Sequence, residues 1–158
     1  KKAYEVVSGL YNDGKIRTLT IRRDMERLED YFIDDLMRNN SLVELQKMFE
    51  QNPSDYLINA AIGRYHLTSD NDVKSAVEAY REILKNPKSP QFYRRQFGFV
   101  LAKNPDYQEN AYQLLKKIYI NVPAIFREKD VIELSNIENH LNIPSDERVT
   151  KIDRYTKD

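Results

Sequence analysis

The chain has 158 residues, of which 41% are hydrophobic, a share that is sufficient to build a folded core. Lysine plus arginine and aspartate plus glutamate both number 25, so no net charge draws the chain to nucleic acid or to an anionic membrane. The chain has no cysteine, which excludes disulfides and thiolate zinc sites, and its apolar runs are far shorter than the ~20 residues of a membrane-spanning helix.

The first predicted helix covers residues 2–12 and ends at Gly14, because glycine readily adopts the left-handed conformation that closes a helix. Its apolar positions at helical spacing are Ala3, Tyr4, Val7, Leu10 and Tyr11. No helix precedes it on which this stripe would pack. We therefore expect residues 1–14 to be the second helix of an incomplete unit, and the chain to be part of a longer protein.

A long helix is predicted next, over residues 20–39. Its apolar stripe is Ile21, Met25, Leu28, Phe32 and Leu36. Its basic residues, Arg22, Arg23 and Arg27, precede its acidic residues, Glu29, Asp30, Asp34 and Asp35, the reverse of the order that the helix dipole favours. We interpret these charges as a solvated face, with a partner surface as the alternative.

Ser41 and Glu44 have the spacing of a capping box, which predicts that a new helix begins there. Further helices are predicted over residues 55–67 and 72–86, and again after Pro90. Gly63 and Gly98 lie 35 residues apart, inside two of these helices. Because glycine destabilises a helix interior, its recurrence at one place in two units indicates close helix packing there.

One apolar pattern recurs along the chain and indicates a stacked helical repeat. The pattern is Ala76, Val77, Tyr80, Ile83 and Leu84; it returns 35 residues later as Ala111, Tyr112, Leu115, Ile118 and Tyr119, and 35 residues earlier as Ser41, Leu42, Leu45, Met48 and Phe49. The stripe of residues 2–12 is a fourth copy, a further 38 residues back.

Beyond Tyr119 the spacing no longer fits this period. A helix is predicted over residues 128–142, with Val131, Leu134, Ile137 and Leu141 on one face. A last short helix is predicted from Pro144, carrying Val149, Ile152 and Tyr155. We expect these segments to form a terminal capping region. The alternative is that they dock on a following domain.

The units resemble tetratricopeptide repeats, which have a small residue in the first helix, an alanine and an aromatic in the second, and a closing proline. The positions that carry this resemblance are Gly63, Ala76, Tyr80 and Pro87, and again Gly98, Ala111 and Pro123. Departures are Asn59 and Arg94 at a large apolar position, Leu115 in place of the aromatic, and a period of 35, which is also that of the RNA-reading pentatricopeptide repeats.

The resemblance implies an all-α, right-handed superhelical solenoid of about three helix-turn-helix units that forms a single domain. The expected units are residues 20–52, 55–87 and 91–122, with residues 1–14 before them and the capping region 123–158 after them. It further implies that the first helices line a concave groove that holds a peptide or protein segment.

Helical geometry locates the groove face of each first helix. The candidate partner-binding residues are Leu57, Arg64 and Leu67 in one unit and Phe92, Arg95 and Phe99 in the next. Large exposed apolar groups mark contacts, and we expect Arg64 and Arg95 to hold an acidic group of the partner. The alternative is that Phe92 and Phe99 pack on a neighbouring helix.

Other activities have less support in the sequence. The chain has two histidines, and its adjacent acidic pairs do not face each other as an acid and base must, so we expect neither an enzyme, nor a metal site, nor a cofactor. Single-stranded RNA binding is disfavoured by the balanced charge. The main alternative to peptide binding is a structural segment of a larger envelope, secretion or export assembly.

Overall fold

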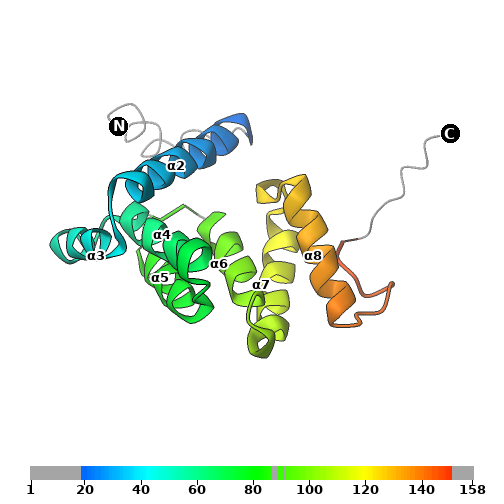
Figure 1. Ribbon diagram of the computed structural model, residues 1–158. Coiled ribbons are helices and arrows are strands. Elements are labelled where there is room, and N and C mark those ends of the chain that lie inside the picture. The colour runs from blue at the N-terminus through cyan, green and yellow to red at the C-terminus, as the bar shows by residue number, and fades with distance from the viewer. Residues whose placement is uncertain (1–18, 87–88, 91, 151–158) are drawn as a thin grey trace. The chain divides into compact units, whose positions relative to one another are not determined.

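The computed structural model describes residues 19–86, 89–90 and 92–150, and within them it contains seven α-helices and no strand (Figure 1). The fold class is therefore all-α, as the sequence predicts. The predicted helix over residues 2–12 lies outside the described residues. Among the described helices, none combines the length and the hydropathy that crossing a bilayer requires.

The chain divides into two compact units, Lys1–Phe97 and Gly98–Asp158, and the boundary falls inside helix α6 (Phe92–Ala102). The described helices of the first unit are α2 (Leu19–Asn39), α3 (Leu42–Gln51), α4 (Tyr56–Tyr65), α5 (Val73–Lys85) and the start of α6. The second unit contains the end of α6, α7 (Gln108–Asn121) and α8 (Glu128–His140), together with short 3-10 turns at Pro105–Tyr107 and Pro123–Ile125.

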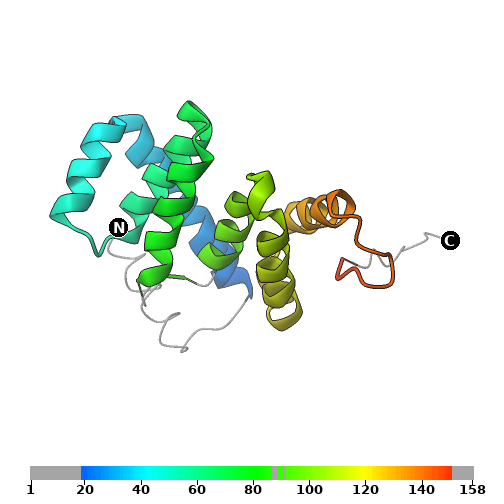
Figure 2. The same ribbon diagram turned by 90° about the horizontal axis from the view of Figure 1, so that it is seen from below.

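In the first unit α4 is central, because it packs on α2, α3 and α5. Both views show α4 and α5 side by side as a hairpin (Figure 1; Figure 2). A π-helical turn at His66–Asp70 follows α4, and the left-handed Asn71 (φ 50°) leads into α5. The predicted stripe of α5 is confirmed at Ala76, Val77, Tyr80 and Ile83, all of which are buried.

The helix starts follow the predicted capping chemistry. The Ser41 hydroxyl accepts a hydrogen bond from the Glu44 amide, and the Glu44 carboxylate accepts one from the Ser41 amide at 2.7 Å, so the predicted capping box at α3 is confirmed. At α5 the Asp72 carboxylate accepts hydrogen bonds from the amide and hydroxyl of Ser75. These bonds satisfy amides that a helix leaves free at its first turn.

The stripe predicted for α2 is correct only in part. Met25 is buried, but Leu28 is 43% exposed, and the buried face is completed by Ile33 and by the acidic Glu26 and Glu29. The side chain of Ile21 lies outside the described ones. Glu26 and Glu29 can be buried on this face because Arg95 of α6 pairs with Glu26 and Tyr56 of α4 donates a hydrogen bond to Glu29.

The helix predicted from Pro144 is wrong for residues 144–150, which form turns. The reason is Glu138, a fully buried carboxylate of α8, which accepts hydrogen bonds from the Val149 amide at 2.8 Å and from the Thr150 hydroxyl. The Tyr112 hydroxyl of α7 donates to the same carboxylate at 3.3 Å. These contacts hold the chain back against α8 in a non-helical form.

Candidate interaction site

Helix α4 positions Arg64 in its last turn, where a cation is favoured by the helix dipole. Asp55 caps the start of this helix, since its carboxylate accepts a hydrogen bond from the Leu57 amide at 3.1 Å. Since α2 packs on α4, the Arg64 side chain faces α2.

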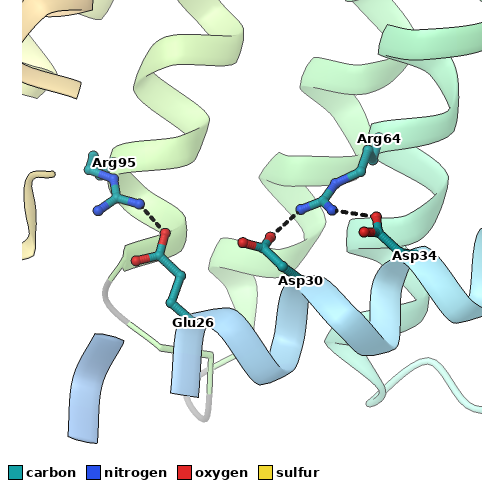
Figure 3. A network of polar contacts seen from close by, with 5 residues as sticks. All are labelled: Glu26, Asp30, Asp34, Arg64 and Arg95. Atoms are coloured by element: carbon teal, nitrogen blue, oxygen red, sulfur yellow. Dashed lines mark hydrogen bonds and ion pairs between the residues drawn. The ribbon is translucent and has the colours of Figure 1, made fainter. Parts of the chain in front are cut away.

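The Arg64 guanidinium bridges two carboxylates that lie one turn apart on α2 (Figure 3). Its Nη2 atom lies 2.5 Å from Asp30 Oδ1, and its Nη1 atom lies 2.9 Å from Asp34 Oδ1. The exposed fractions of the three side chains are 23% for Arg64, 34% for Asp30 and 53% for Asp34, so the bridge remains accessible from solvent. A planar guanidinium suits this paired recognition of carboxylates.

Arg95 makes the corresponding contact from α6, but in the interior. Its guanidinium pairs with the Glu26 carboxylate of α2, and the two side chains are only 1% and 6% exposed (Figure 3). Glu26, Asp30 and Asp34 follow each other at steps of four, so they form one acidic stripe along α2. That stripe holds both arginines that the sequence assigned to a partner.

A fourth acid of α2, Glu29, is held by tyrosines. The Tyr56 hydroxyl donates to Glu29 Oε1 at 3.0 Å, and the Tyr56 and Tyr93 rings pack edge to face, with their centroids 5.6 Å apart. Burial raises the pKa of Glu29 to about 8, although hydrogen bonds from Tyr93 and Tyr56 act to lower it. Burial also raises the pKa of Tyr93 well above its usual value.

The prediction that the candidate residues form an exposed face is wrong for three of them. Phe92, Arg95 and Phe99 are only 3%, 1% and 8% exposed. The Phe99 ring packs edge to face on Phe126, with the centroids 6.2 Å apart, which agrees with the alternative that the phenylalanines are packing residues. The other three candidates are half-buried and keep some access to solvent: Leu57, Arg64 and Leu67.

The acidic stripe is the feature that sequence reasoning missed. The sequence predicts a solvated face for the charges of α2, whereas Glu29 is buried and Asp30 is partly covered, and the buried Glu26 is not among the residues of that prediction. The signal was present as the spacing of four between Glu26, Asp30 and Asp34, together with Arg64 in α4 and Arg95 in α6. The order of the charges along α2 distinguishes its two ends and does not indicate this face.

The second unit has a small cavity of about 120 Å³. It is lined by Phe99, Ala102, Lys103, Gln108, Glu133, Asn136, Ile137 and His140. Burial raises the pKa of Glu133, and the charge of Lys103 acts against that rise. The cavity is too small for a drug-sized ligand, which needs about 300 Å³ or more.

Within the part of the chain that the structure describes, no group of three or more histidine, cysteine, aspartate or glutamate side chains is placed to hold a metal ion. Comparison with protein-family models gave no match, and neither the curated proteins nor the solved structures gave a significant one. The proposal for the function of this chain therefore rests on its own sequence and geometry.

Proposed function

We propose that this chain is a protein-interaction scaffold built from tetratricopeptide-like helical hairpins. The observation that carries the proposal is a contact that recurs in two hairpins. A Cβ atom built on Gly63 of α4 would lie 2.8 Å from the Tyr80 ring of α5, and one built on Gly98 of α6 would lie 2.6 Å from Leu115 of α7.

The two contacts are equivalent in sequence. In each hairpin the glycine and its partner are 17 residues apart, and the two pairs are displaced by 35. The two helices approach each other closely at the same position in both hairpins, which supports a tandem repeat of one hairpin. A hairpin of this kind buries its apolar face by stacking on its neighbours, and the stack in our proposal is a right-handed solenoid.

Arg64 is the centre of the partner-binding site that we propose. It is the arginine of the pair that solvent reaches, and Asp34, one of its two carboxylates, is more than half exposed. An acidic group of a protein partner would replace Asp34 while Asp30 stays in place. The half-buried Leu57 and Leu67 of the same unit would supply apolar contact. The partner class is therefore an acidic peptide or protein segment.

A second candidate function is structural, as a segment of a larger envelope, secretion or export assembly. The burial of Phe92, Arg95 and Phe99 favours it, because a face closed by internal packing admits no peptide there. Removing one partner of a buried ion pair such as Glu26 with Arg95 costs about 3 to 5 kcal/mol, so Arg95 has a structural role in either case. RNA binding has less support, since lysine plus arginine only equals aspartate plus glutamate in the chain.

The experiment is a selection from a displayed library of random peptides on the purified chain. We expect enrichment of peptides that contain aspartate or glutamate, with amide shift changes at residues 57–67. Replacing Arg64 by Ala should weaken those peptides about tenfold or more, the loss expected for a charge-assisted hydrogen bond.

The matched control is Arg81→Ala, which removes an exposed arginine of α5 that pairs with Glu78. It should leave peptide affinity unchanged. Selection of no peptide, or equal binding to wild type and the Arg64 variant, would favour the structural function. Retention of random single-stranded RNA that weakens with added salt would favour RNA binding.

A further inference from the structure

Helix α2 has an exposed face opposite the side that packs on the other helices of the first unit. Tyr31 at its centre is 61% exposed and Leu28 is 43% exposed, large values for apolar side chains. The charged residues of this face, all exposed, are Asp24, Arg27, Asp35 and Arg38. At 100° per residue the six side chains fall within an arc of about 100°, and Tyr31 lies about 200° from the buried Glu29.

The charges on this face are arranged symmetrically about Tyr31. Asp24 and Arg38 lie seven residues before and after it, and Arg27 and Asp35 lie four before and after it. Reversing the direction of the helix therefore exchanges an aspartate for an arginine at each position. Two copies of the face, placed antiparallel with Tyr31 against Tyr31, bring opposite charges together at all four positions.

A parallel pair has the reverse property. It would oppose Asp24 to Asp24 and Arg27 to Arg27, and like charges across an interface are costly. Charge complementarity thus selects both the partner and the direction. We infer that α2 pairs with α2 of a second copy of this chain, antiparallel and centred on Tyr31.

The contacts that these groups make within the chain do not prevent the pairing. Arg27 lies 4.0 Å from Asp24, with side chains 80% and 58% exposed, and Arg38 donates to the Asp34 carbonyl at 3.3 Å. Such exposed pairs contribute little to stability, about 0 to 1 kcal/mol, so they exchange easily for contacts across an interface. Tyr31 supplies the aromatic centre that interfaces favour.

The face from residue 24 to residue 38 is about 21 Å long, at 1.5 Å per residue. A contact of this length is smaller than a standard interface, so the dimer is weak and dissociates on dilution. The pairing uses none of the residues of the proposed peptide site, although Asp34 of that site borders this face of α2.

Charge exchange tests the register directly. The variants Asp24→Arg and Arg38→Asp each place like charges together twice in a homodimer, so each alone should sediment as a monomer at concentrations where the wild-type chain dimerises. Mixed in equal amounts, they restore both opposite-charge pairs, and the dimer should return. The control Arg81→Asp makes the same change of charge on the exposed face of α5 and should dimerise like wild type.

A cysteine at position 31 gives a second readout, because the chain has no other cysteine. Tyr31→Cys should form a disulfide-linked dimer under mild oxidation, since the two-fold axis brings the residue against itself. Ile120→Cys, at a position on α7 that is also 61% exposed, should do so only slowly. A wild-type chain that stays monomeric near millimolar concentration, single variants that dimerise like wild type, or a mixture that stays monomeric would each overturn the proposal.

Discussion

Three acids of α2, Glu26, Asp30 and Asp34, meet arginines, whereas Glu29 meets the hydroxyl of Tyr56. The difference matters for the charge of Glu29. A guanidinium compensates a carboxylate for lost hydration, and a tyrosine hydroxyl compensates it less. Burial therefore raises the pKa of Glu29 to about 8, and near neutral pH this carboxyl is mostly protonated.

We predict that Glu29 makes the free energy of unfolding fall as pH rises. The pKa of Glu29 is raised from 4.5 to about 8 by folding, so between these values the native state holds a proton that the unfolded state has released. Stability is then complete below the unfolded pKa and is lost toward pH 8, by up to about 1.4 kcal/mol per pH unit.

Urea unfolding of wild type and Glu29→Gln between about pH 5 and pH 9 measures this effect. The variant keeps a neutral side chain of similar size and should lose most of the slope. It should also be the more stable of the two at the alkaline end. Parallel stability curves for the two proteins would show that Glu29 does not carry the pH dependence.

At the scale of the helices, the two helices of each hairpin approach closely because the residue at the contact is a glycine, which has no side chain. A glycine inside a helix is usually about 1 kcal/mol less stable than alanine, so Gly→Ala is normally stabilising. At Gly63 the added methyl would meet the buried Tyr80 ring, and at Gly98 it would meet Leu115. Overpacking of this kind outweighs the gain in helix propensity.

We therefore predict that Gly63→Ala and Gly98→Ala each lower the free energy of unfolding by about 1 to 3 kcal/mol. Chemical denaturation of the two variants measures the loss. Combining Gly98→Ala with Leu115→Ala should cost less than the sum of the two single changes, because the smaller side chain leaves room for the methyl. An unchanged or increased stability in either glycine variant would refute the close packing on which the proposed repeat rests.

The sequence was sufficient for the helices and their starts, since these depend on local patterns. Helical periodicity predicts α5 and α8, and the spacing of Ser41 and Glu44 predicts the start of α3. It failed at Pro144, where a carboxylate of α8 holds the backbone amide of Val149. A hydrogen bond of this kind joins residues from different elements, and local propensity contains no information about it.

For the molecule as a whole, the sequence located the candidate residues of α4 and α6 but not what covers them. It predicted that Arg64 and Arg95 hold an acidic group of a partner, whereas in the structure Arg64 pairs with Asp30 and Asp34, and Arg95 pairs with Glu26, all of α2. The expected exposure of Phe92 and Phe99 was wrong, because helical geometry gives the direction of a side chain and not the identity of its neighbours. Burial arises from packing between elements.

A solenoid in which hairpins stack in one register, as we propose, predicts a regular series of distances between equivalent positions. Val43, Glu78 and Gln113 are exposed, lie on α3, α5 and α7, and are spaced by 35 residues. The chain has no cysteine, so pairs of cysteines at these positions would accept spin labels at those sites alone.

Double electron–electron resonance on the three pairs of labels measures these distances. A stacked repeat predicts similar distances for the pair 43 and 78 and for the pair 78 and 113, with a clearly longer distance between 43 and 113. A distance between 43 and 113 as short as the other two would indicate a closed bundle and would contradict the stacked repeat.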